Sequence, residues 1–98
     1  MEFEWDPAKN AECIARRGID FGDAARIFEG LVLERIDGRR EYGEPRQVAI
    51  GRVNGLELTV VYTDRSDPET DSIKRRIITA WRSNRRERKA YAEANPLL

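Results

Sequence analysis

Hydrophobic residues recur along the first third of the chain with the spacing of one strand and two helices. Phe3 and Trp5 alternate with glutamates, which is typical of a short strand with one apolar face. Asp6 and Pro7 are preferred residue types at a helix start, and Gly18 is placed to end that helix in a left-handed turn. In order, the pattern predicts a strand over residues 2–5, a helix over 7–17, a second helix between Asp20 and Gly30, and a strand over Leu31–Ile36.

The middle of the chain carries a strong hairpin signal. Two apolar runs, Gln47–Val53 and Leu56–Thr63, are separated by Asn54-Gly55, and both central residues of a type I′ turn need a positive φ. A two-residue turn pairs the residues that flank it and so fixes the register of the two strands. Since both faces of the two runs are partly apolar, we expect them to be central strands of a sheet.

Two polar loops, one more strand and a last helix complete the predicted fold. These are a charged loop over Asp37–Pro45, a loop over Asp64–Ser72, a strand over Ile73–Trp81 and a helix from Ser83-Asn84 to about Asn95. The order predicts a single α+β domain over residues 1–98. Its sheet should be mostly antiparallel, with two N-terminal helices and a C-terminal helix packed on it.

The composition excludes several classes of site. The chain has no histidine and one cysteine, Cys13, so it cannot by itself build a Cys/His zinc site, a Ser-His-Asp triad or an intramolecular disulfide. No run of about 18 apolar residues is present, as a membrane span would need. The N-terminal residues MEFEWD lack the basic start and apolar stretch of a signal peptide. We therefore expect a cytoplasmic protein that uses no metal or cofactor and does not contact a membrane.

The net charge of zero hides a basic C-terminal end. Residues 1–73 carry more acidic than basic side chains, whereas residues 74–98 carry eight Lys and Arg and only two Glu. Arginine presents a planar fork that matches phosphate, so this end is typical of a site for phosphate or an acidic partner. A solvated helix surface explains the charges equally well. The basic residues concerned are Lys74, Arg75, Arg76, Arg82, Arg85, Arg86, Arg88 and Lys89.

Arg76 lies in the middle of a predicted strand. If that strand is regular, Arg76 shares one face with Ile78 and Ala80, and the other face carries Ile77, Thr79 and Trp81. An arginine in this position is costly to bury without a partner. It therefore either opens onto a groove, as a phosphate site would require, or pairs with a carboxylate in a structural role.

Three other side chains have both a structural and a functional interpretation. Trp81 and Tyr62 fit a hydrophobic core, and either could instead stack a base. Glu87 follows Asn84 by three residues, which is the spacing of a capping box. Its functional alternative is a general base at the head of a basic helix.

A chain without histidine can still cleave RNA. The 2′-hydroxyl of RNA is the nucleophile, so the protein needs only to position the strand, assist one proton transfer and stabilise charge on the phosphate. Arginines supply the charge stabilisation, and a carboxylate or tyrosine can assist the proton transfer. Simple binding of nucleic acid fits the composition equally well.

Two blocks of the sequence together resemble the BrnT family of bacterial type II toxins. The first is FEWDPAKN followed by RRGIDFGDAARIF, and the second is VVYT followed by RRIITAWRSNRRERKAY. The resemblance covers about residues 2–91 in order. It implies a RelE-like fold and a ribonuclease toxin that inhibits translation. It also implies a neighbouring BrnA-like antitoxin with a ribbon-helix-helix part, in a complex that binds promoter DNA and represses it.

The resemblance also suggests which residues contact RNA. Arg76 and the basic residues after Trp81 match the family's RNA-facing block, whereas Arg17 and Trp81 stand where the family usually has histidine and often has arginine. The expected catalytic residues are Arg76, Arg82 and Arg85, which would hold one phosphate, and Glu87 as the base. The expected RNA-binding residues are Arg46, Tyr62, Trp81, Arg86, Arg88 and Lys89.

Two other functions remain open. In the first, the basic end is a non-enzymatic module that binds nucleic acid or an acidic protein. In the second, the arginines are all paired with carboxylates and the chain is a subunit of something larger.

Overall fold

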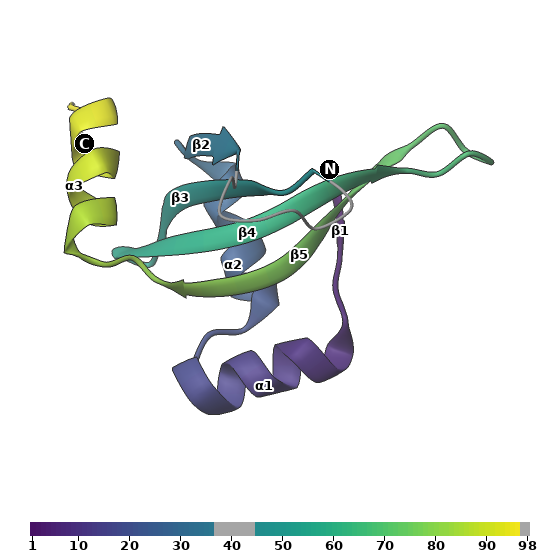
Figure 1. The fold of residues 1–98 in the computed structure, drawn as a ribbon, viewed down its shortest axis with the longest axis horizontal. Coiled ribbons are helices and arrows are strands. Elements are labelled where there is room, and N and C mark those ends of the chain that lie inside the picture. The colour runs from purple at the N-terminus through teal and green to yellow at the C-terminus, as the bar shows by residue number, and fades with distance from the viewer. Residues whose placement is uncertain (37–44, 97–98) are drawn as a thin grey trace.

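The computed structural model describes residues 1–36 and 45–96, and these residues form a five-stranded mixed sheet with three α-helices (Figure 1). The predicted α+β class is confirmed. The predicted loop over Asp37–Pro45 lies, except for Pro45, outside the described residues. The elements are β1 (Glu2–Glu4), α1 (Pro7–Arg17), α2 (Phe21–Ala25), the 3₁₀ turn η1 (Arg26–Glu29), β2 (Leu33–Ile36), β3 (Gln47–Val53), β4 (Leu56–Ser66), β5 (Ile73–Arg82) and α3 (Arg85–Ala94).

The predicted helix starts are confirmed in atomic detail. The Asp6 carboxylate accepts a hydrogen bond from Ala8 N at 2.9 Å, and Gly18 ends α1 with a φ of 68°. Asp20 likewise caps α2 by accepting from Gly22 N at 2.8 Å. The second helix is shorter than predicted, because after Ala25 the chain tightens into η1.

The central hairpin has the predicted register. Asn54 and Gly55 have φ values of 51° and 79°, as a type I′ turn requires. The flanking Val53 lies opposite Leu56. The hairpin of β4 and β5 is longer than predicted, because Asp64–Ser66 continue β4 instead of forming a loop. Figure 1 shows this hairpin projecting beyond the rest of the sheet.

The sheet order is β1-β5-β4-β3-β2, and β1 is parallel to β5 whereas the other pairs are antiparallel. β1 pairs with β5 only as far as Arg76. Beyond that residue α1 lies along β5 (Figure 1), where Cys13 Sγ and Arg17 Nη1 donate to the Ala80 carbonyl at 3.4 and 2.9 Å. Side chains of α1 thus satisfy a strand edge that no described strand covers.

A β-bulge in β5 overturns the prediction of a regular strand. Tyr62 pairs with Ile77, but its neighbour Val61 pairs with Thr79, so Ile78 is an extra residue. The bulge reverses the alternation of side chains along the rest of the strand. Ile77 and Ala80 consequently both lie in the core, and Arg76, Thr79 and Trp81 belong to the opposite face.

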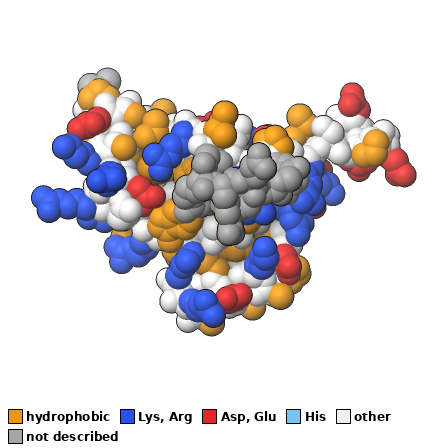
Figure 2. All heavy atoms as spheres, viewed as in Figure 1, with side chains coloured by type: hydrophobic (Ala, Val, Ile, Leu, Met, Phe, Trp, Pro, Cys, Tyr) orange, Lys and Arg blue, Asp and Glu red, His pale blue; other side chains and the backbone are white. Residues whose placement is uncertain are grey.

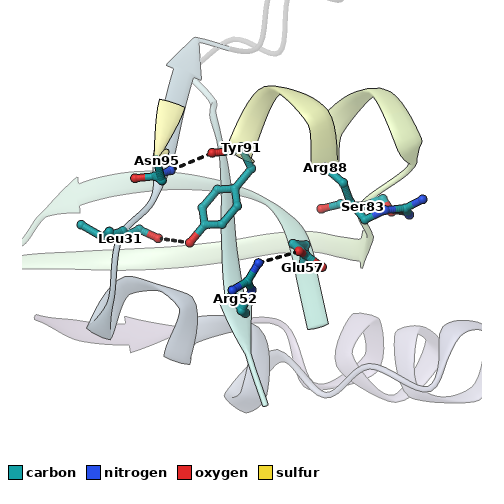
Figure 3. A network of polar contacts seen from close by, with 7 residues as sticks. All are labelled: Leu31, Arg52, Glu57, Ser83, Arg88, Tyr91 and Asn95. Carbon is teal, nitrogen blue, oxygen red and sulfur yellow. Dashed lines mark hydrogen bonds and ion pairs between the residues drawn. The ribbon is translucent and has the colours of Figure 1, made fainter. Parts of the chain in front are cut away.

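The hydrophobic core lies between the sheet and the N-terminal helices. Its largest fully buried side chains include Tyr62, Phe21 and Ile27. The C-terminal helix α3 packs at the far end of the sheet, where Tyr91 Oη donates to the Leu31 carbonyl at 2.9 Å and the Arg52 guanidinium lies 5.9 Å from the centre of the Tyr91 ring (Figure 3). These contacts fix α3 relative to β3.

Candidate functional site

Four cationic side chains from four parts of the chain line one cavity of about 180 Å³. They are Lys9 of α1, Arg46 just before β3, Arg65 of β4 and Arg76 of β5. Asp6 supplies a carboxylate to the same cavity, and Ile77 and Ile78 contribute to its walls. We call this the arginine cavity. Because arginine forks and a lysine ammonium both bind phosphate oxygens, the cavity has the chemistry of an anion site.

The register of the sheet explains why these residues meet. Thr63 of β4 lies opposite Arg76, and Arg65 follows Thr63 by two residues, so both arginines lie on the same face. Gln47 pairs with Tyr62, which brings the preceding Arg46 to the same end of the sheet. The sheet face opposite the hydrophobic core thus positions three arginines together.

Arg76 is partly exposed and only loosely paired. Its Nη1 lies 3.8 Å from Glu4 Oε1, and 29% of its side chain is exposed. Both alternatives considered for Arg76 are therefore realised in part, since it lines a cavity and also faces a carboxylate. An ion pair of this length and exposure contributes at most about 1 kcal/mol, and a guanidinium has five N–H donors. Arg76 can therefore still bind an anion.

The neighbouring Arg75 has a structural role. Its Nε and Nη2 donate to the two oxygens of Asp64 at 2.8 and 2.9 Å, and its guanidinium lies 4.6 and 4.4 Å from the ring centres of Phe28 and Tyr62. These hydrogen bonds to the Asp64 carboxylate raise the pKa of Arg75. Only 14% of the side chain is exposed. Alternation along β5 thus places Arg75 against aromatic rings on the core side of the sheet and Arg76 in the cavity on the other side.

Tyr62 is fully buried beneath this arginine. Burial, together with the Glu34 carboxylate, raises the pKa of its phenol well above the ordinary value. Its hydroxyl oxygen has no hydrogen-bond partner among the described residues. In this structure Tyr62 offers no surface on which a base could stack. Its position therefore does not support the expectation that it binds RNA.

Trp81 and Glu87 form a polar network at the start of α3. Trp81 Nε1 donates to Oε1 and Oε2 of Glu87 at 3.1 and 3.3 Å, and Glu87 Oε1 accepts from Asn84 N at 2.8 Å. The predicted capping box is confirmed, because Asn84 Oδ1 also accepts from Glu87 N at 2.8 Å. Only 8% of Glu87 is exposed, so its carboxylate is largely occupied in holding the helix start.

Arg17 joins this network from α1. Its Nη1 donates to Thr79 Oγ1 at 3.2 Å as well as to the Ala80 carbonyl, and its guanidinium lies 5.9 Å from the centre of the Trp81 ring. Arg17 and Trp81 are the two positions at which the sequence is expected to depart from the pattern of the family it resembles. The structure brings these two side chains into contact as a cation–π pair.

The basic residues of α3, together with Arg82 at the end of β5, form a second positive surface, separate from the arginine cavity. Figure 2 shows Lys and Arg side chains gathered over α3. Arg88 also donates from Nη1 to the Ser83 carbonyl at 2.7 Å (Figure 3), which fixes its side chain. The exposed members of this surface are Arg82, Arg85, Arg86, Arg88 and Lys89.

The expectation that Arg76, Arg82 and Arg85 hold one phosphate is therefore corrected. At roughly 3.3 Å per residue, the strand from Arg76 to Arg82 spans roughly 20 Å, so the two arginines contact different parts of any bound strand. Of the expected site residues, only Arg76 and Arg46 line the arginine cavity, whereas Lys9 and Arg65 were missed. Arg65 could have been predicted if the length of the β4–β5 hairpin had been predicted correctly. The longer strand β4 includes Arg65 and places it on the same face as Thr63.

A sequence model of one family, described as the ribonuclease toxin BrnT of type II toxin–antitoxin systems, matches residues 5–87. The chain belongs to the BrnT family. It is accordingly a ribonuclease toxin of a type II system, with RNA as substrate and an antitoxin as partner. The match includes every residue of the arginine cavity and ends at Glu87, so Arg88 and Lys89 lie outside it. No curated protein matches the chain in sequence.

Two further features concern the described residues only. Over residues 1–36 and 45–96, no group of three or more Cys, Asp or Glu side chains is placed to hold a metal ion. Within the same ranges no helix has the length and apolar character that crossing a membrane requires.

Proposed function

We propose that this BrnT toxin is an endoribonuclease that cleaves RNA without a metal ion and binds the scissile phosphate in the arginine cavity. The observation that supports this proposal is that Lys9, Arg46, Arg65 and Arg76 all line one cavity of about 180 Å³. In a small, partly enclosed site, fixed cations stabilise developing negative charge more strongly than they would in water. The basic surface of α3 would hold a more distant part of the same strand.

The proposed reaction uses the 2′-hydroxyl of the substrate. Its oxygen attacks the phosphorus as the bond to the 5′-oxygen breaks, which leaves a 2′,3′-cyclic phosphate on one product and a 5′-hydroxyl on the other. The 2′-hydroxyl proton passes to a base, and the departing 5′-oxygen takes a proton from water or an acid. The arginines neutralise the extra charge on the phosphate during the attack.

We assign the base in this site to Asp6. Asp6 is the one acidic residue among the described residues that line the arginine cavity, and its Oδ1 caps α1 by accepting from Ala8 N. Glu87, the base expected earlier, sits on α3 and could serve only a phosphate bound at that end of the molecule. Exchanging each carboxylate for its amide therefore tests where the cleaved phosphate lies.

The cellular role follows from membership of a type II family. We propose that the toxin inhibits translation in the cytoplasm by cutting RNA there. A BrnA-like ribbon-helix-helix antitoxin would neutralise it, and the complex would repress its own promoter DNA. Growth arrest on expression of the toxin alone, relieved by co-expression of the neighbouring antitoxin, is the expected result.

The decisive experiment compares Arg76→Ala with Arg26→Ala. Arg26 is an exposed arginine of η1 that lies outside the arginine cavity, so it controls for loss of one positive charge. Each protein is induced in a bacterium and new RNA ends are mapped by a method that separates 5′-hydroxyl from 5′-phosphate. We expect new 5′-hydroxyl ends with the parent and with Arg26→Ala, and none with Arg76→Ala. Purified toxin should cleave equally well with a chelator present.

Two results would count against this proposal. Cleavage that requires an added divalent ion would refute the metal-free mechanism. RNA that binds in a salt-dependent manner but stays intact, both in cells and with the purified protein, would favour the non-enzymatic binding module.

A further inference from the structure

A cavity of about 480 Å³ lies between β1 and the segment formed by α2 and η1, and we call it the β1 groove. Phe3 and Phe28 stack in its wall with ring centres 5.8 Å apart, and Met1 is 69% exposed. An open apolar hollow of this size on a small domain is typical of a surface that binds a partner. The walls are formed by Met1, Phe3, Trp5, Gly22, Ala25 and Phe28.

The β1 groove and the arginine cavity lie on opposite faces of the same edge of the sheet. The carboxylates of Glu2 and Glu4 each lie 3.8 Å from a cation of β5, Lys74 Nζ and Arg76 Nη1 respectively. Because side chains alternate along a strand, the intervening Phe3 points to the other face, toward the groove. A partner in the groove and RNA in the arginine cavity therefore contact different surfaces.

The groove borders a strand edge that is open in the described part of the chain. β1 is the last strand in the sheet order, so no described strand pairs with its outer edge. Such an edge can pair with an extended segment of another chain, whose alternate side chains would then enter the groove. A small organic ligand would instead need polar groups placed around it, whereas the charged side chains of the lining, Arg26 and Glu29, are exposed and lie 3.9 Å from each other. The surroundings thus favour a polypeptide.

The charges beside the β1 groove favour a basic segment. The β4–β5 hairpin projects next to the N-terminal end of β1 (Figure 1), and its tip over residues 66–73 carries Asp67, Glu69 and Asp71 but no Lys or Arg. Ile73, which follows this acidic tip, is 51% exposed and extends the apolar surface toward it. Carboxylates in this position repel RNA and attract Lys or Arg side chains.

We propose that the antitoxin docks in the β1 groove and along the open edge of β1, through an extended segment in which apolar side chains are flanked by Lys or Arg. Membership of a type II system provides the protein partner. The inference does not depend on which cavity holds the cleaved phosphate. Only β1 separates the docked segment from Arg76, so the chain that follows the segment can reach the arginine cavity.

The apolar part of the test uses one variant at each edge of the sheet. The affinity of the full-length toxin for the purified antitoxin encoded beside it is measured by calorimetry. Phe3→Ala removes a wall of the groove and should weaken binding by about tenfold or more. Ile36→Ala is the matched control, since Ile36 is 78% exposed on β2 at the opposite edge, and it should bind as the parent does.

The charge part of the test compares two exposed glutamates. Glu69→Lys at the hairpin tip should weaken antitoxin binding several-fold at low salt, and the difference from the parent should shrink as salt is raised. Glu93→Lys makes the same charge change on α3, away from the groove, and should leave the affinity unchanged.

A contact map of the unaltered toxin keeps the test decisive if Phe3→Ala unfolds. Amides of the deuterated, ¹⁵N-labelled toxin should show cross-saturation from unlabelled antitoxin at Phe3, Trp5 and Phe28. Contacts confined to the arginine cavity or to β2, or a folded Phe3→Ala that binds as the parent does, would overturn the inference. It would also fail if the toxin alone formed a dimer through the groove that persists in the complex, because a second copy would then be the occupant.

Discussion

Removal of the Glu87 side chain should destabilise the protein, because its carboxylate accepts hydrogen bonds from two donors, Asn84 N and Trp81 Nε1. In Glu87→Ala, Asn84 N loses its acceptor at 2.8 Å and Trp81 Nε1 loses its acceptors at 3.1 and 3.3 Å. Hydrogen bonds to a charged group contribute about 1.5–3 kcal/mol each when buried, and water can replace part of the bond to Trp81. The expected loss of unfolding free energy is about 2–3 kcal/mol.

Thermal and urea unfolding measure this loss directly. For a domain of this size each kcal/mol lowers Tm by about 4–8 °C, so Glu87→Ala should unfold roughly 10–20 °C earlier than the parent. Glu93→Ala is the matched control, since Glu93 is an exposed glutamate of the same helix. A loss below about 1 kcal/mol for Glu87→Ala would refute the reasoning.

The isosteric change Glu87→Gln separates structure from catalysis. The amide keeps one acceptor oxygen, so we expect a loss of only about 1 kcal/mol and RNA cleavage within a few-fold of the parent. If Glu87 is instead the base, cleavage should fall by about 10²- to 10⁴-fold at a temperature where the variant is folded. That result would place the cleaved phosphate beside α3 and contradict the assignment of Asp6.

Three further predictions follow from individual side chains. Asp6→Asn should keep the stability of α1, because Asn caps helices as well as Asp, yet lower RNA cleavage by about 10²-fold or more in a single-turnover assay. Tyr62→Phe should leave unfolding free energy unchanged or raise it by about 1 kcal/mol, because it removes a buried hydroxyl without a described partner. Burial raises the pKa of Tyr62, so just above about pH 10 only the unfolded parent releases the phenol proton and the parent loses stability as pH rises. Tyr62→Phe has no such proton, and its urea unfolding should depend less on alkaline pH. The hydrogen bond from Arg52 lowers the pKa of Glu57 below its ordinary value of 4.5, so the contribution of Glu57 is present above that pH and lost as pH falls. Glu57→Gln should therefore flatten the acid side of the stability profile, and an unchanged slope would contradict this.

Local signals in the sequence predicted the parts of the fold that depend on near neighbours. The caps at Asp6 and Asp20, the turn at Asn54-Gly55 and the capping box at Glu87 each involve residues within three or four positions of one another. Their chemistry is complete within one turn of chain, so residue types alone indicate the structure. The BrnT resemblance was likewise visible in short ordered blocks, and the family match confirms it.

The candidate site was harder to predict because it depends on register between distant strands. The extra residue Ile78 reversed the faces of every later residue of β5, and no local signal marked it. Lys9 and Arg65 reach the arginine cavity from elements whose relative placement only the folded sheet fixes. Charge along the sequence instead drew attention to α3, where basic residues are consecutive but lie far from the cavity.

The contact between Arg17 and Trp81 shows how a departure from a family pattern can be read once the structure is known. From the sequence alone, Arg17 and Trp81 are expected to stand where the family usually has histidine and often has arginine, and each expected departure suggests a lost function. In the structure the cation and the ring lie 5.9 Å apart, and the same arginine satisfies the Ala80 carbonyl. Trp81 in turn donates a hydrogen bond from Nε1 to Glu87 at the start of α3. Arg17 and Trp81 therefore form one packing unit that ties α1 to α3, and neither side chain lines the arginine cavity.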